Sequence, residues 1–318
     1  MSASRFQSNL IFDFDAMSAQ QQHPPDLMLP EKQSTNAVKH SRLRTRMPKI
    51  VTGSPKSLCL PHLLELDDIS AALIVRQESP WDTYLPAITY DIAGPVVIAA
   101  RRTRPSRVVA LRKYQRQDAK RLIDRFGRLE HANILCVREC YIDGHSMFAL
   151  GDDLPLTLAH IVSCVGLYPT EVQLGSILSQ TLDGAWYLAA SGLSHPSFSC
   201  CKILLGLDGI VKIACWDYCV DCTPGQAEAA YIAALPSITM RLMQKYDKEE
   251  GVAGVDDLRR WPVDSDAVGF LSATARTVSI RSLKEQPLVA AKHRPASDLV
   301  VLARMILLSS QVPCTYES

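Results

Sequence analysis

Short apolar runs separated by turn residues follow one another between residues 84 and 153. Their length and their content of valine and isoleucine are typical of strands. The predicted strands are residues 88–92, 96–100, 108–112, 135–141 and 146–150. A helical pattern at residues 118–128 follows the third of these strands. The pattern therefore predicts an α+β fold with five strands and one inserted helix.

Two Asp-Gly pairs predict hairpin turns, because glycine readily adopts the positive φ that such turns need. Asp143-Gly144 joins the last two predicted strands. Asp208-Gly209 lies between two short apolar runs, residues 203–205 and 210–214. We therefore expect a second hairpin well after the first group of strands.

The chain from residue 154 to residue 310 shows mainly helical periodicity. Thr170 and Gln173 form a capping-box signature, in which each side chain satisfies a backbone amide of the other residue. A long helix with one apolar face is expected after it. Further helical patterns cover residues 229–245, where Pro236 predicts a kink, and residues 266–271 and 299–308. The last pattern is apolar on nearly all sides, so we expect that helix to be buried or bound to a partner.

The first 83 residues differ from the rest. Residues 1–56 are mostly polar and are interrupted by proline and glycine, which predicts a disordered arm. Residues 57–83 read as a linker that contains a short amphipathic helix at residues 60–75. We expect this helix to pack on the domain that follows.

Composition narrows the class of protein. The chain has 318 residues, 47% of them hydrophobic, which is enough for a sizeable core. Its net charge is only +1, so the protein as a whole has no strong positive potential that would attract a polyanion. This argues against nucleic acid as a partner. No apolar run reaches the ~18 residues of a membrane helix, and the N-terminus lacks a signal-peptide layout. The ten cysteines are scattered, so we expect reduced thiols in an intracellular protein, cytoplasmic or nuclear, without a membrane partner.

Several short motifs occur in an order that resembles the eukaryotic protein kinase family, over roughly residues 84–290. They are Val109-Ala110-Leu111-Arg112 for V-A-I-K, His131-Ala132-Asn133-Ile134 for H-P-N-I, Leu193-Ser194-His195, Lys202-Ile203-Leu204-Leu205 and Val211-Lys212-Ile213-Ala214. The resemblance implies a two-lobe fold. A five-stranded antiparallel N-lobe sheet would span residues 84–153, and a mainly helical C-lobe with a shortened activation segment would span residues 154–310.

The residues that carry kinase chemistry are replaced at the matching positions. His195 is kept, but Ser197 stands for the catalytic aspartate, Lys202 for the metal-binding asparagine and Cys215 for the aspartate of D-F-G. A lysine repels Mg²⁺, and a serine is a poor proton acceptor at neutral pH. The resemblance therefore implies a degenerate member of the family, a pseudokinase, in which these four positions are not catalytic.

The nucleotide-binding features are also weakened. Only Gly94 remains of the glycine-rich loop, and Arg112 replaces the compact lysine ammonium. The glutamate that pairs with that lysine in the family falls on Leu122. If a nucleotide pocket exists, the resemblance implies that it is formed by Gly94, Val96, Ala110, Arg112 and Leu204.

The cysteines after residue 195 allow two interpretations. Thiolates together with an imidazole can form a tetrahedral zinc site. The candidate ligands are His195, Cys200, Cys201, Cys215, Cys219 and Cys222. Alternatively, the thiols are inert and buried, which is a common state for cysteine.

We expect a protein without catalytic activity or cofactor that acts as an interaction or allosteric scaffold. Its partner would be a protein, for example an active kinase or another signalling protein. Two alternatives stay open. One is a nucleotide sensor that binds ATP without Mg²⁺, with Lys202 and Arg112 neutralising the phosphates. The other is an atypical active Ser/Thr kinase that uses ATP and acids at other positions, such as Asp217 or Asp221.

Overall fold

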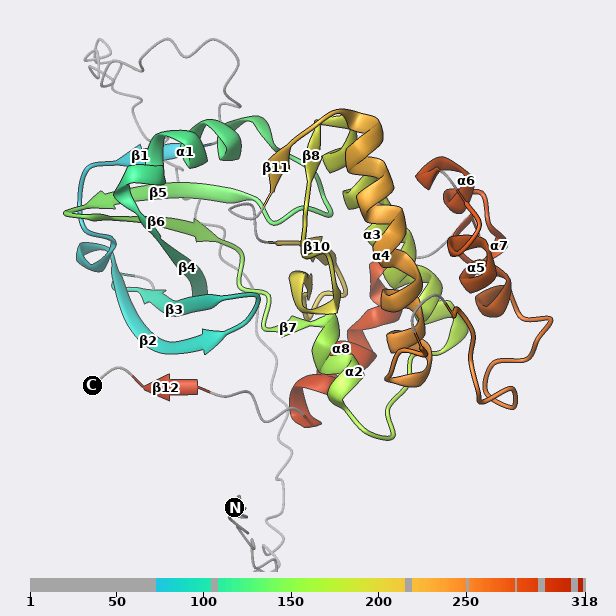
Figure 1. Ribbon diagram of the computed structural model, residues 1–318. Coiled ribbons are helices and arrows are strands. Elements are labelled where there is room, and N and C mark those ends of the chain that lie inside the picture. Colours follow the sequence, from blue (N-terminus) through green and yellow to red (C-terminus); the bar gives the residue numbers. More distant parts are fainter. Residues whose placement is uncertain are drawn as a thin grey trace, which may run out of the picture. The chain divides into compact units, whose positions relative to one another are not determined.

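The computed structural model (Figure 1) describes the chain from residue 73 onward, with short gaps. The described residues are 73–103, 108–214, 219–249, 252–277, 279–290, 295–309 and 314–316. The predicted arm, residues 1–56, lies outside the described residues, as does most of the predicted linker and its helix. All described residues belong to one unit of the chain, residues 62–318.

A mixed sheet of seven strands is the largest element of the described part, in the order β1-β5-β6-β4-β3-β2-β12. Its strands are β1 (Ile74–Arg76), β2 (Tyr84–Asp91), β3 (Pro95–Arg101), β4 (Val108–Gln115), β5 (Val137–Asp143), β6 (Ser146–Gly151) and β12 (Cys314–Tyr316). The β1–β5 pair is parallel, and the other pairs are antiparallel. Strands β2 to β6 are the five predicted ones. The prediction of a purely antiparallel, five-stranded sheet was wrong because two edge strands are added.

Both added strands are three residues long, which is too short for a periodic pattern to reveal. β1 overlaps the last two residues of the predicted helix 60–75, so the end of that prediction was wrong. Ile74 and Val75 are β-branched and pair with β5. β12 follows the last predicted helix along the chain and pairs with β2.

The sheet buries side chains on both faces, as the alternation along a strand requires. On one face lies α1 (Ala119–Arg128), which follows the 3-10 turn η2 (Arg116–Asp118) at the predicted place. Leu122 and Phe126 of α1 join the main core there. On the other face, Trp81 of the 3-10 turn η1 (Pro80–Asp82) packs edge-on against Phe148.

Helices are the main regular elements of the chain after β6 (Figure 1). They are α2 (Leu158–Ser163), α3 (Glu171–Ala190), α4 (Pro224–Gln244), α5 (Asp266–Thr274), α6 (Ile280–Lys284), α7 (Pro287–Ala290) and α8 (Val300–Ser309), with the 3-10 turns η3 (Cys200–Lys202) and η5 (Ala296–Leu299). The capping box at the start of α3 is confirmed. The Thr170 amide donates to Gln173 Oε1 at 2.9 Å, and the Gln173 amide donates to Thr170 Oγ1 at 3.2 Å.

Two helices differ from their predictions. α4 begins at Pro224, earlier than expected, and it includes Pro236 within its length. α8 is buried on one side only. Val301, Met305 and Leu308 on its other side are 62%, 47% and 88% exposed.

Two small sheets complete the fold. The predicted hairpin around Asp208-Gly209 is confirmed as β9 (Ile203–Leu205) and β10 (Val211–Ile213), and β7 (Leu156–Thr157) pairs with β9. β8 (Leu193–Ser194) pairs with β11 (Val220–Asp221). None of the described helices is long and apolar enough to cross a membrane.

Candidate functional site

The guanidinium of Arg112, on β4, donates to the loop between β2 and β3. Nη2 lies 2.8 Å from the carbonyl oxygen of Ile92. Nη1 lies 3.1 Å from the carbonyl oxygen of Ala93 and 3.5 Å from that of Gly94. The guanidinium therefore donates hydrogen bonds to three backbone carbonyls of a single loop.

The backbone of this loop determines what it presents to Arg112. Ala93 and Gly94 both have positive φ, 53° and 97°, and the Ile92 amide donates to the Gly94 carbonyl at 3.1 Å. Positive φ costs nothing for glycine but is uncommon for alanine. Phosphates bind where backbone amides converge. Here carbonyl oxygens converge on the guanidinium, and these oxygens would repel a phosphate.

The apolar residues of the predicted nucleotide pocket pack against the protein itself. Val96, Ala110 and Leu204 are buried in one hydrophobic cluster. The other buried members of that cluster are Ile92, Ile98, Leu135, Leu154 and Ala214. The structure thus brings all five predicted pocket residues together, with Gly94 and Arg112 in contact at the loop. The three apolar residues retain little surface for a ligand.

Three of the four degenerate catalytic positions, His195, Ser197 and Lys202, lie between β8 and β9. His195 is buried, and its Nδ1 accepts a hydrogen bond from the Ser197 amide at 3.2 Å, so the ring shapes the turn. Ser197 is exposed. The backbone of Lys202 accepts from the Ala214 amide at 3.0 Å, which ties this turn to the end of β10. Cys215 lies outside the described residues. Residues 195–202 contain no carboxylate that could orient a hydroxyl nucleophile.

The cysteines do not form a recognisable metal centre where the structure describes them. Cys200 is buried, and burial raises the pKa of its thiol to about 12. Zinc binds the thiolate, so a raised thiol pKa opposes coordination. Cys219 is also buried, whereas Cys201 is exposed. Across the described residues, no group of three or more His, Cys, Asp or Glu side chains could hold a metal ion.

Arg125 makes a contact that the sequence did not reveal. Its Nη1 donates to the Cys219 carbonyl at 2.7 Å, and its Nη2 donates to Asp221 Oδ2 at 2.9 Å. The Arg125 side chain is only 9% exposed, whereas that of Asp221 is 84% exposed. Through these two bonds, Arg125 connects α1 to residues 219–221, which follow residues 215–218 in the sequence. A cavity of about 330 Å³, lined also by Arg121 and Arg128, lies beside it.

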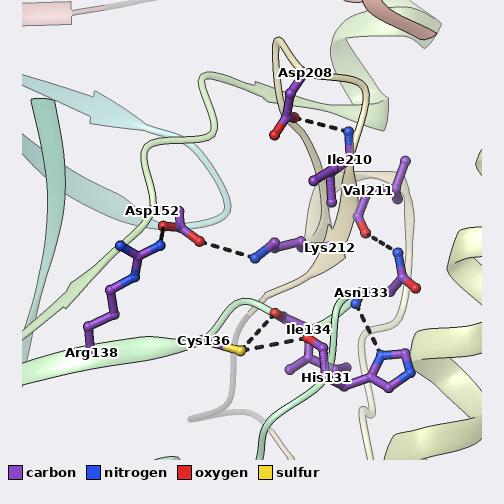
Figure 2. Close-up of polar contacts among 10 residues, drawn as sticks. All are labelled: His131, Asn133, Ile134, Cys136, Arg138, Asp152, Asp208, Ile210, Val211 and Lys212. Carbon is purple, nitrogen blue, oxygen red and sulfur yellow. Dashed lines mark hydrogen bonds and ion pairs between the residues drawn. The ribbon is translucent and has the colours of Figure 1, made fainter. Parts of the chain in front are cut away.

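A second polar connection joins β6 to β10 (Figure 2). Asp152, just after β6, accepts hydrogen bonds from Arg138 and from Lys212, whose Nζ lies 3.1 Å from Asp152 Oδ2. Lys212 belongs to β10, so one carboxylate connects the large sheet with the hairpin.

The loop before β5 is joined to the same hairpin through backbone bonds. The Leu135 amide donates to the Ile213 carbonyl, and the Ile213 amide donates to the Asn133 carbonyl, both at 2.9 Å. The Asn133 side chain donates to the Val211 carbonyl at 2.9 Å (Figure 2). Three cavities, of about 760, 590 and 400 Å³, open around Arg138 and Asp152.

Comparison with known proteins adds no family to this description. No family model matches the chain, and a search of curated proteins finds no match either. The resemblance to protein kinases therefore stays a prediction from the sequence.

Proposed function

We propose that this protein is a kinase-like domain without catalysis that acts through protein contacts, as an interaction or allosteric scaffold. The observation that carries the proposal is the position of Arg112. In the resemblance, this residue would hold the phosphates of ATP. Its guanidinium instead donates to the carbonyls of Ile92, Ala93 and Gly94.

Phosphoryl transfer needs a phosphate cradle, a metal ion and a group that orients the nucleophile. The loop offers carbonyls to the cation, and the apolar pocket residues are buried among themselves. The turn at residues 195–202 holds Ser197 and Lys202 where the family has acid and amide groups. These features support a fold that has kept its packing and lost its chemistry.

Polar contacts that the chain makes with itself join several of its elements, and this supports a scaffold. Arg112 closes the β2–β3 loop, Arg125 joins α1 to Asp221 of β11, and Asp152 connects Arg138 with Lys212. Each is made by the chain's own groups. A structure held in this way presents a fixed surface for binding.

The outer side of α8 supports protein contact as the mode of action. Val301, Met305 and Leu308 share one helix face and stay exposed. A contiguous exposed apolar patch is a usual feature of protein–protein interaction sites. We take this face as the first surface to test.

Nucleotide binding is tested by thermal unfolding of the full chain with millimolar ATP, with and without Mg²⁺. A ligand of the native state raises the unfolding midpoint by mass action. We expect an unchanged midpoint in both conditions. A rise that persists in chelator would contradict the proposal in favour of a nucleotide sensor. A rise only with Mg²⁺ would contradict it in favour of an active kinase.

Protein contact is tested with the immobilised full chain and a double variant, Met305→Asp with Leu308→Asp. Val165→Asp is the matched control, because Val165 is an apolar residue outside α8 that is 95% exposed. We expect at least one specifically bound protein to be lost from the double variant and kept by the control. Identical sets of bound proteins would exclude the α8 face.

A further inference from the structure

Positive charge gathers on and just before α1, although the whole chain carries a net charge of only +1. Residues 113–128 contain six basic and two acidic side chains. Three of the basic ones, Arg121, Arg125 and Arg128, line the cavity of about 330 Å³ beside α1. They are four and three residues apart, a spacing that places them on one face of the helix. The cavity is therefore a concave site to which one helix face contributes three guanidinium groups.

Arg125 positions the helix that carries the other two arginines. Its terminal nitrogens donate to the Cys219 carbonyl at 2.7 Å and to Asp221 Oδ2 at 2.9 Å, which holds α1 beside β11 (Figure 1). The Arg125 side chain is only 9% exposed. A ligand that enters the cavity therefore meets Arg121 and Arg128 as its main donors.

Arg121 and Arg128 have donors to spare. Arg121 lies 3.6 Å from Asp118 in an exposed ion pair, a kind of contact that contributes little to stability. Arg128 is exposed and has no hydrogen-bond or ion-pair partner among the described residues. Seven positions along a helix correspond to about 10 Å. Two arginine side chains at this distance can converge on one anion between them, each with its own planar pair of donors.

We propose that this cavity binds a phosphate monoester on a protein partner, as in a phosphoserine or phosphothreonine side chain. The inference rests on the proposed function, because it names the class of partner that the scaffold holds. A phosphate is a dianion with three acceptor oxygens and can satisfy two guanidinium forks, whereas a carboxylate can satisfy one. Clusters of arginine are a recurring way to recognise phosphorylated peptides.

The acidic residues of the lining favour a peptide over a membrane as the carrier of the phosphate. Asp124 and Asp221 belong to the same cavity, and the Asp221 side chain is 84% exposed. A surface of anionic headgroups would bring like charge against both carboxylates. A peptide offers them backbone amides or a basic side chain beside its phosphate.

The test uses the full chain and beads that carry short peptides of randomised sequence around a fixed central phosphoserine. Matched beads carry serine or glutamate at that position. We expect the wild type to prefer phosphoserine, and Arg121→Gln with Arg128→Gln to lower its binding about tenfold or more. The control, Arg116→Gln with Lys120→Gln, removes the same charge from exposed positions that do not line the cavity. Binding without phosphate preference, or an equal loss in both double variants, would overturn the proposal.

A single substitution guards against a loss of folding. Arg128→Lys keeps the charge at an exposed position but loses the planar fork, so it should keep the unfolding midpoint of the wild type and bind phosphopeptide more weakly. Wild-type affinity in this variant would contradict a role for the fork. We expect no binding to phosphatidylcholine vesicles that contain phosphatidylinositol phosphate. Vesicle binding that the cavity double variant abolishes would overturn the assignment to a protein partner.

The outcome is separable from that of the proposed function. If no phosphopeptide binds while the α8 double variant still loses a specifically bound protein, the cavity assignment falls and the scaffold stands. If a phosphopeptide binds through Arg121 and Arg128 while ATP raises the unfolding midpoint, the cavity assignment stands and the nucleotide-independent scaffold falls.

Discussion

Arg112 donates to the carbonyl oxygen of Ile92 at 2.8 Å, and through this bond β4 supports the loop between β2 and β3. The kinase resemblance places Leu122 where that family has a glutamate that pairs with the basic residue, and Leu122 is buried in the core. The guanidinium has no acidic partner among the residues that the structure describes, and it uses backbone carbonyls as acceptors. An arginine can do so because its planar fork donates in several directions at once. The loop between β2 and β3 is thus held by a side chain of β4.

Replacing Arg112 by methionine should lower the free energy of unfolding by about 1–3 kcal/mol, because half-buried carbonyls lose a charged donor. Arg116→Met is the matched control. Arg116 also donates to a hairpin carbonyl, that of Gly144 at 2.8 Å, but the contact is exposed. We expect its loss to cost less than ~1 kcal/mol. Urea unfolding measures both, and equal effects of the two variants would refute the special role of Arg112.

Replacing Arg125 by methionine should loosen the chain around Cys219. The guanidinium is mostly buried and donates to a carbonyl, so we expect a loss of about 1.5–3 kcal/mol in unfolding free energy. Asp221→Asn removes only an exposed partner and should cost less than ~1 kcal/mol. Hydrogen exchange at residues 219–222 should accelerate in the arginine variant alone. Similar exchange in both variants would show that Arg125 acts mainly through Asp221.

Local signals in the sequence predicted much of the fold. The Asp-Gly hairpins, the capping box at Thr170 and the helix after the third strand each depend on a few neighbouring residues. The resemblance to protein kinases, rather than a local signal, placed Gly94, Val96, Ala110 and Arg112 at one site, and the structure brings them together.

Features that depend on distant residues escaped prediction. β1 and β12 exist through pairing with strands far along the chain. The carbonyls that face Arg112 belong to a loop in which Ala93 adopts a positive φ. This conformation is uncommon for alanine, so the sequence did not predict it. Gly184 is similar. A Cβ there would lie 2.6 Å from the Asn133 carbonyl oxygen, so this glycine permits α3 to approach the loop, and only the fold reveals it.

Gly209→Ala should be among the most destabilising single changes in the described chain. Gly209 has a φ of +82°, and an added Cβ would overlap the carbonyl oxygen of Ala296. Backbone strain and overlap together predict a loss of at least ~2 kcal/mol in unfolding free energy. Gly225→Ala is the control, because nothing lies within 4 Å of its added Cβ. A Gly209 variant as stable as the Gly225 variant would contradict the close contact.

Lys245 should make stability depend on pH in the alkaline range. It ends α4 with a φ of 76°, and its Nζ donates to the carbonyls of Ile161 and Leu167, both at 2.6 Å. Burial lowers the pKa of this amino group from 10.5 to about 8. Between these values the unfolded chain holds more protons than the folded one, so this group's contribution to stability rises with pH.

The test compares wild type with Lys245→Gln between pH 7.5 and 10.5 by urea unfolding. Burial raises the pKa of the Cys140 and Cys200 thiols from 9.0 to about 12, so these thiols lower stability as pH rises above 9 in both proteins. The difference between the two proteins cancels that effect and isolates the lysine. We expect wild type to gain stability relative to the variant as pH rises from about 8. A difference that is constant with pH would show that Lys245 keeps an ordinary pKa in the folded protein.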